Sequence, residues 1–231
     1  MNRSDRVLTV LTVIAALGIL GAAVMALWIA PDAVGLTPDN TYAQRIIYFH
    51  VPSAWLSMLA FGVTMLGSIA YLITSKRRWD SLALSSAELG LVFTLAAMAS
   101  GSIWARPAWN TWWTWDPRLT TYTIMFLLFV AYFMLRSAME DAARRARFAA
   151  VYGIFAFLSV PITFMSIRWW RTIHPVLIDP TKGFGLSPSM MSAFFYSLGA
   201  FTLLYGVLLW HRVRLEGSRE QLEALKEQLD R

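Results

Sequence analysis

Six stretches of this 231-residue chain are long and apolar enough to cross a membrane as helices. A bilayer core needs about 20 consecutive apolar residues in helical form. We place the spans at 7–29, 50–74, 82–104, 121–139, 148–167 and 189–210. The first is longer than the apolar part of a signal peptide, which runs to about 15 residues, so we interpret it as a retained span. A cleaved signal there would leave the orientation of the other spans unchanged. The chain is predicted to be all-α, with residues 1–231 forming one six-helix transmembrane domain.

The basic residues predict which side of the membrane each loop faces. Lysine and arginine concentrate on the cytoplasmic side of membrane proteins. Fourteen of the twenty basic residues fall in the two termini and in the two loops on the same side as the termini. Both termini are therefore expected in the cytoplasm, in agreement with an even number of spans. In a bacterium this describes a multi-pass protein of the inner, or cytoplasmic, membrane.

Three loops are expected on the outer face: 30–49, 105–120 and 168–188. Binding residues lie more often in loops than in spans, so these loops are where we look for a site. In the first, Thr37 and Pro38 suit the start of a short interfacial helix that runs towards His50. On the inner face, residues 212–231 combine spaced leucines with charges and are predicted to form an amphipathic cytoplasmic tail.

The composition excludes several kinds of chemistry. The chain has no cysteine, so it forms no disulfide, thiolate metal site or iron–sulfur cluster of its own. It also lacks the Cys-x-x-Cys-His motif that attaches haem covalently. The formal charge of +6 follows the membrane topology rather than forming a basic surface, so no nucleic-acid partner is expected.

Tryptophan is concentrated in the second outer loop and at the end of the span just before it. Five of the eleven tryptophans lie within twelve residues there: Trp104, Trp109, Trp112, Trp113 and Trp115. Interfacial anchoring explains one or two tryptophans at the end of a span, as for the other six, but not five. An indole packs on a flat ring and donates a hydrogen bond from its N–H. The cluster favours an apolar wall for a planar ligand at the membrane surface.

Two of the three histidines flank this cluster in sequence and face the same side. His50 opens the second span and His174 lies in the third outer loop, whereas His211 lies at the inner end of the last span. A single interfacial histidine usually bonds a neighbour or water. Two of them beside an aromatic wall favour a metal-bound porphyrin, because neutral imidazole is a common axial ligand of haem iron. His50 and His174 are the predicted metal ligands.

Charged residues close the tryptophan cluster. Asp116 is expected to accept hydrogen bonds from backbone N–H groups and fix the loop. Arg118 has three alternative partners: Asp116, a lipid phosphate, or a haem propionate bound in bidentate fashion. Arg45 and Arg106 are weaker candidates for the propionate contact, and a lipid headgroup is an equal alternative for each.

Residues 109–120 read WNTWWTWDPRLT. This run resembles the tryptophan-rich WWD signature of the haem-handling proteins of cytochrome c maturation. The six spans, a histidine on either side of the signature and the run Tyr48–Pro52 make the whole chain resemble the CcmC family in particular. The related CcmF-type and CcsA-type proteins are longer and have more spans.

The resemblance implies a function and a set of partners. A CcmC-like protein accepts haem b, non-covalently and transiently, at the periplasmic face. It then presents the haem to the chaperone CcmE, together with the CcmA/CcmB ABC transporter and the small protein CcmD. The family's axial histidines fall on His50 and His174. Its signature falls on Trp109, Trp112, Trp113, Trp115, Asp116 and Arg118.

Two positions depart from the family pattern. Asn110 replaces the usual glycine, and asparagine tolerates left-handed backbone better than most residues. Pro117 stands where alanine is common and restricts Asp116 to extended or turn geometry. Neither change removes a proposed ligand, but both bear on the shape of the loop.

Two other functions remain as alternatives to haem presentation. The chain could transport haem or another solute through its own helices, but the predicted spans offer one carboxylate, Glu88, and no basic residue near mid-membrane. It could instead scaffold an ABC transporter through its leucine-rich tail. We find no nucleophile–base pair in the sequence and therefore do not expect an enzyme.

Overall fold

The structure is a computed structural model that describes residues 2–33, 38–179 and 183–229. Within these ranges, six helical segments are long and apolar enough to cross a membrane. The first is α1 (Arg3–Val24), which continues into a π-helical turn, η1 (Met25–Ile29). The second and third are α3 (Ile47–Thr74) and α4 (Arg77–Trp109). The others are α5 (Pro117–Ser137), the pair α6 (Ala142–Phe157) and α7 (Ser159–Trp169), and α8 (Pro188–Leu229). The prediction of an all-α, six-span membrane protein is confirmed.

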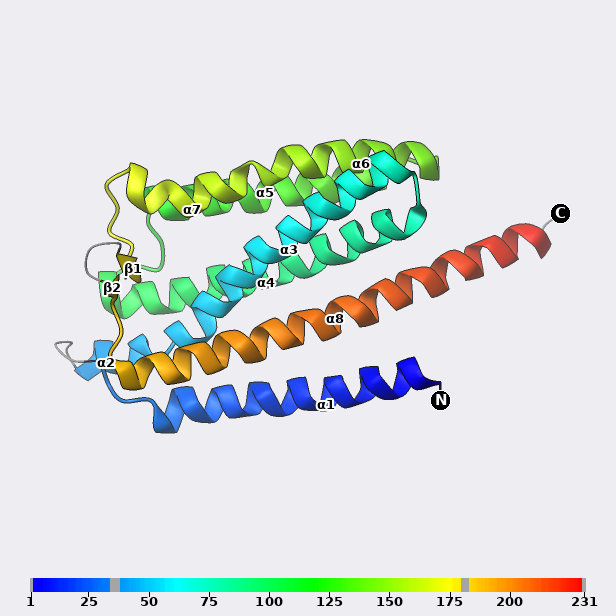
Figure 1. The fold of residues 1–231 in the computed structure, drawn as a ribbon. Helices are drawn as coiled ribbons and strands as arrows, with labels where there is room; N and C mark the ends of the chain where they lie inside the picture. Colours follow the sequence, from blue (N-terminus) through cyan, green and yellow to red (C-terminus); the bar gives the residue numbers. More distant parts are fainter. Residues whose placement is uncertain (1, 34–37, 180–182, 230–231) are drawn as a thin grey trace.

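The two ends of the bundle differ in what they carry. Both chain termini lie at one end, which we call the inner end (Figure 1). The short helix α2 (Pro38–Gln44) and the two-residue strands β1 (Ile178–Asp179) and β2 (Gly183–Phe184) lie at the opposite, outer end (Figure 1). All three predicted outer loops are therefore brought together at the outer end.

The outer loops are shorter than the sequence indicated. α4 continues through Pro107 to Trp109, so the second loop comprises residues 110–116 rather than 105–120. α2 begins at Pro38 as expected, whereas the capping role expected of Thr37 lies outside the described residues. The third loop contains the antiparallel β1–β2 pair, which the all-helical prediction missed because each strand has only two residues. Apolar length alone does not show where a helix stops beyond the hydrocarbon.

Helices α3 and α4 pack against each other along the middle of the bundle (Figure 1). Small residues line this contact: Ser57, Ala60, Thr64, Ala83, Ser86 and Gly90 are buried. Small side chains let helix backbones approach closely in a membrane, where the hydrophobic effect does not drive helix association. The fifth span breaks at Leu158, between α6 and α7, because Pro161 cannot donate to the carbonyl of Phe157.

Two ion pairs tie α4 to its neighbours in the inner half. Arg136 of α5 donates to both carboxylate oxygens of Asp80, at 2.6 and 2.9 Å, and both side chains are only 9% exposed. Glu88 accepts two hydrogen bonds from Arg212 of α8. Glu88, the one carboxylate predicted within a span, therefore binds a neighbouring helix and is not free to line a path across the membrane.

Candidate functional site

His50 lies in the first turn of α3, and its side chain is held by α4. Its Nδ1 is 3.0 Å from the carbonyl oxygen of Ala97 and 3.1 Å from Oγ of Ser100. A carbonyl only accepts hydrogen bonds, so Nδ1 carries the proton, and Nε2 keeps its lone pair. This is the arrangement that orients a metal-binding histidine: one nitrogen bonded to the protein, the other available to a metal.

His174 shows the same arrangement in the loop after α7. Its Nδ1 lies 3.0 Å from the carbonyl oxygen of Pro175, so Nδ1 again donates and Nε2 keeps its lone pair. Burial, reinforced by the positive charge of Arg118, lowers the pKa of His174 from 6.5 to about 4; the Pro175 carbonyl and Asp116 oppose this shift. His174 is therefore neutral at physiological pH, the form in which imidazole binds a metal.

The two imidazoles lie close enough to act on each other. The charge that His174 can carry acts electrostatically on His50, and the charge of Arg118 acts on both rings. The interaction between two charges weakens with distance, so side chains whose charges act on one another lie in the same part of the outer end. The two predicted ligands, 124 positions apart in the chain, are thus brought together by the fold.

Asp116 connects the tryptophan-rich loop to the loop that carries His174. It caps α5 by accepting from the backbone N–H of Arg118 at 3.0 Å. It also accepts from Thr172 Oγ1 at 2.7 Å and from the N–H of Ile173 at 2.9 Å. The prediction that Asp116 fixes its own loop is confirmed, and the structure adds that it fixes the His174 loop as well.

The two residues that depart from the family signature, Asn110 and Pro117, set the backbone conformation at the two ends of the tryptophan-rich loop. Asn110 ends α4 in left-handed conformation, with φ of 55°. Pro117 occupies the first position of α5, and Asp116 before it is extended, with φ of −58° and ψ of 147°. Both residues therefore adopt the backbone that their chemistry favours, and the loop keeps a defined shape.

Arg118 is anchored on α7 and not on Asp116. Its guanidinium donates to the carbonyl oxygen of Thr163 through one nitrogen. This leaves further N–H groups of the fork for another acceptor. Of the three partners weighed for Arg118, an ion pair with Asp116 is absent among the described residues, while the lipid and propionate alternatives remain.

Four of the five tryptophans form two edge-to-face pairs, so the cluster is not one flat bed. Trp104 and Trp109 lie on the last turns of α4, with ring centroids 5.1 Å apart and planes at 77°. Trp113 and Trp115 in the loop are 6.0 Å apart at 82°. Trp112 and Trp115 are exposed, at 60% and 73%. A ring stacked on one indole would therefore meet the edge of the next, so the cluster offers faces in several directions.

A hollow of about 500 Å³ lies between α4, the loop of residues 110–116 and the start of α5. It falls within the range of about 300–1,000 Å³ that is typical of ligand sites. Its lining is mostly apolar: Leu95, Met98, Ala99, Ser102, Trp113, Trp115 and Thr123. Met98 on this lining is adjacent to Ala97, which holds His50, so the hollow and the imidazole flank the same turn of α4.

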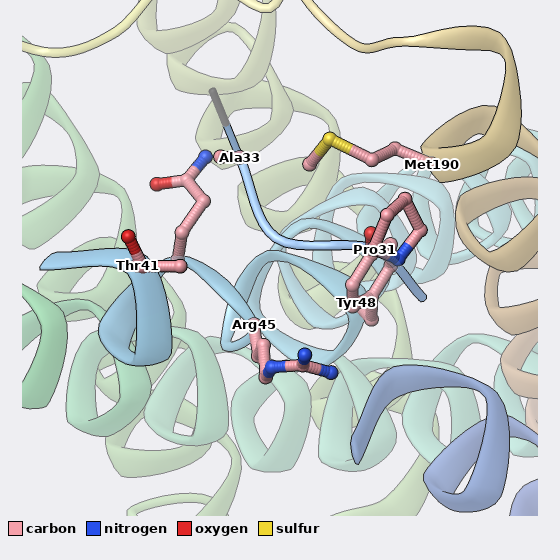
Figure 2. Close-up of a pocket in the computed structure, with 7 residues that line it drawn as sticks. Pro31, Ala33, Thr41, Arg45, Tyr48 and Met190 are labelled. Carbon is pink, nitrogen blue, oxygen red and sulfur yellow. The ribbon is translucent and has the colours of Figure 1, made fainter. Parts of the chain in front are cut away.

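The weaker arginine candidates have structural roles. Arg45 donates to the carbonyls of Ala26 and Leu27, at 2.8 and 3.1 Å, and pairs with Asp32 at 2.7 Å. It borders a hollow between α2, α3 and the start of α8 (Figure 2), but this hollow has no room for a water molecule and is far below the usual size of a ligand site. Arg106 donates to the carbonyl and side chain of Asn110 at the end of α4.

Several supporting residues were not predicted. Gly101 faces His50: a Cβ there would stand 2.9 Å from the ring carbon Cε1. Thr172 bonds both Asp116 and the N–H of His174. In the signature, the buried hydroxyls of Thr114 and Thr120 have no hydrogen-bond partner among the described residues. Their roles depend on contacts between distant segments, so no sequence pattern indicated them.

These features define a class: a six-span membrane protein that carries two imidazoles with unprotonated Nε2 atoms beside a tryptophan-rich loop at one end of its bundle. Residues 1–228 match the family described as heme exporter protein C, CcmC, and the chain belongs to this family. This confirms the resemblance drawn from the signature.

Relatives support the same assignment. The chain is 36% identical to heme exporter protein C of Bradyrhizobium diazoefficiens over 196 residues, which cover 83% of this chain and 74% of the relative. It is 32% identical to heme exporter protein C of Escherichia coli K12 over 175 residues, 76% and 70% of the two chains. A putative cytochrome c biosynthesis ccmC-like mitochondrial protein of Marchantia polymorpha is 28% identical over 183 residues, 79% and 76% of the two chains.

Proposed function

We propose that this protein binds haem b non-covalently at the periplasmic face of the bacterial inner membrane and presents it to the haem chaperone CcmE. It would act with the CcmA/CcmB ABC transporter and CcmD. Membership of the heme exporter protein C family supports haem delivery for cytochrome c maturation. The observation that carries the residue assignment is that both outer imidazoles use Nδ1–H to bond a backbone carbonyl.

The site has the donor set that haem requires. His50 and His174 would supply the two axial nitrogens, and neutral imidazole is a normal axial ligand of haem iron. The indoles Trp104, Trp109, Trp112, Trp113 and Trp115 would provide apolar faces for the porphyrin. Arg118, held near both rings, would bind a propionate with the remaining N–H groups of its fork. Asp116 would position the two loops and would not contact the iron.

Presentation to a partner follows from how exposed the site is. Trp112 and Trp115 stand in the loop with more than half of their surface open, at the outer end of the bundle. A ligand held there remains within reach of a protein on the same side of the membrane, whereas a deep cavity would retain it. A delivery component needs only to bind and release, so the proposed role includes no chemical step on haem.

The test is an absorption spectrum of the detergent-solubilised protein purified with its partner subunits, oxidised and reduced. The variants His50→Ala and His174→Ala are each expected to lower haem occupancy or shift the Soret band. His211→Ala is the matched control, because His211 Nε2 bonds Thr12 at 3.0 Å near the inner end. Unchanged spectra in both single variants would refute the ligand assignment.

Two further outcomes separate this proposal from its alternatives. A protein with no Soret absorbance even in the presence of its partners would favour a scaffold role for the chain. Haem uptake by vesicles that contain this chain alone would favour transport through its own helices. The structure gives no support to transport, because Asp80 and Glu88 are each paired with an arginine of a neighbouring helix.

A further inference from the structure

The last helix is much longer than a span and projects from the inner end of the bundle. α8 contains 42 residues, which corresponds to about 63 Å of helix, against about 30 Å for a bilayer core. Its C-terminal part extends past the inner ends of the other helices (Figure 1). Among the described residues, Arg214, which pairs with Asp5 of α1, is the last residue of α8 with an ion pair to another span. The part beyond it, residues 215–229, is about 22 Å long.

The projecting part carries an apolar seam with heptad spacing. Leu215, Leu222 and Leu229 are seven residues apart, and Leu225 follows Leu222 by three. These are the a and d positions of a coiled coil. All four leucines are more than half exposed, at 63%, 54%, 86% and 57% for Leu215, Leu222, Leu229 and Leu225. Within the described residues, no other part of the chain covers them.

One edge of the seam is basic. With Leu222 at position a, Arg219 and Lys226 occupy successive e positions, and Gln221 and Gln228 occupy g. Arg219 pairs with Glu223 on its own helix at 3.3 Å, but both side chains are more than half exposed. Such a pair contributes little free energy, so Arg219 can exchange this partner for a carboxylate on another helix.

We infer that this seam, formed by Leu215, Leu222, Leu225 and Leu229, docks a partner helix whose own apolar stripe is flanked by acidic residues. The e and g positions of a coiled coil set partner choice through charge. Two heptads make a weak contact in free solution, because sustained pairing normally takes three or four. The partner is therefore a protein held at the same membrane, where tethering raises its effective concentration.

A second copy of this chain is a poorer occupant. Two copies in one membrane would pair in parallel, which places g of one helix opposite e of the next heptad on the other. This sets Gln221 against Lys226 and Arg214 against Arg219, so no attractive charge pair forms. The lipid surface is also a poor occupant. Residues 213–231 contain four basic and five acidic residues, and α8 runs on without a break that would turn the tail onto the membrane.

The experiment uses the full chain in phosphatidylcholine nanodiscs and two fluorescent helical peptides of about 21 residues with leucine at a and d. Each peptide carries a lipid anchor that holds it in the same nanodisc, and binding is read as energy transfer to a dye on the tail. One peptide has glutamate at e and g, and the other has lysine. We expect the acidic peptide to bind about tenfold more tightly at low salt, with the preference shrinking as salt rises. The double variant Arg219→Glu/Lys226→Glu should reverse the preference, and Leu222→Glu/Leu225→Glu should abolish binding of both peptides.

One control variant tests whether the effect belongs to the seam, and four results would overturn the inference. Gly217→Glu adds a charge at position c, away from the seam, where a Cβ would meet nothing within 4 Å, and it should bind the acidic peptide as the wild type does. Equal binding of both peptides, or wild-type binding by the leucine variant, would overturn the inference. So would light scattering that shows a dimer lost in the leucine variant, or preferential binding of the tail to phosphatidylserine vesicles. The Soret band should not change in any tail variant, so this test is independent of the proposed haem site.

Discussion

In the inner half of the bundle charged side chains of neighbouring helices bind one another, whereas at the outer end two imidazoles each keep one nitrogen without a hydrogen bond. Asp80 and Arg136 satisfy each other through two hydrogen bonds inside the protein. By contrast, the Nε2 atoms of His50 and His174 have no hydrogen bond in the described structure. Paired charges hold helices together, whereas a nitrogen that keeps its lone pair can bind a ligand, so this difference separates a structural end from a binding end.

The largest effect is expected from breaking the inner pair. Asp80→Ala leaves the guanidinium of Arg136 buried without its carboxylate, and removing one member of a buried pair costs about 3–5 kcal/mol. Thermal unfolding followed by circular dichroism in detergent should show a much lower midpoint. Replacing both residues by leucine should recover most of the loss, because no uncompensated charge remains.

This prediction also sharpens the contrast between the two ends. The Asp80→Ala protein that remains folded should bind haem with the wild-type Soret position, since Asp80 lies far along α4 from the tryptophan loop. A shifted Soret band in that folded fraction would show that the inner pair is part of the binding end, and the comparison would fail.

A second effect is expected at the junction of the two outer loops. Asp116→Asn replaces an acceptor with an amide N–H₂ next to the N–H of Ile173 or the hydroxyl of Thr172, at a cost of about 1–3 kcal/mol. We expect faster proteolysis within residues 170–177 and weaker haem binding. Thr172→Ala removes only one of these bonds and should have a smaller effect of the same kind. If both variants bound haem with the affinity of the wild-type protein, Asp116 would not position His174.

A third effect is expected from filling the space next to His50. Gly101→Val places side-chain atoms where a Cβ alone would stand 2.9 Å from the imidazole. Overpacking costs about 1–3 kcal/mol, and the ring must move from the carbonyl of Ala97. Haem titration should show about tenfold weaker binding for a displacement energy of about 1.4 kcal/mol. Gly199→Val is the control, since a Cβ at Gly199 meets nothing within 4 Å.

The smallest effect is expected from mild acid. The pKa of His174 is lowered to about 4 in the folded protein, against 6.5 when unfolded. Between these values the unfolded chain binds more protons, so the contribution of His174 to stability falls as pH drops from 6.5 towards 4. His174 itself stays neutral, and the Soret band should keep its position from pH 7.5 to 5.5. A spectral transition centred near pH 6.5 that His174→Ala removes would contradict this burial.

The sequence predicted the spans and the local backbone well because both depend on nearby residues. Six apolar stretches gave six membrane-spanning helices. Pro38 begins α2, Pro117 begins α5, and Asn110 takes the left-handed conformation at the end of α4. The limits of the outer loops were less accurate. A helix can extend beyond the hydrocarbon, as α4 does to Trp109, wherever capping and packing support it.

The arrangement of the site depended on contacts that no local pattern contains. The tryptophan cluster was visible in the sequence, but its edge-to-face pairing was not. The role of Gly101 requires α3 and α4 to be packed together, and the role of Thr172 requires the loop after α7 to meet the start of α5. The expected propionate role of Arg118 stays a prediction, with its anchor on Thr163 now defined.

By itself the sequence determined a six-span helical membrane protein, the likeness to its family, and two histidines and a WWD signature on one side. Hydropathy, charge bias and rare residue clusters are properties of short segments, and they persist whatever the segments pack against. Only the tertiary structure decided that His50 and His174 share one region, which nitrogen of each carries the proton, and that Asp116 joins their loops. These facts depend on distances between residues far apart in the chain, which are set when the helices pack.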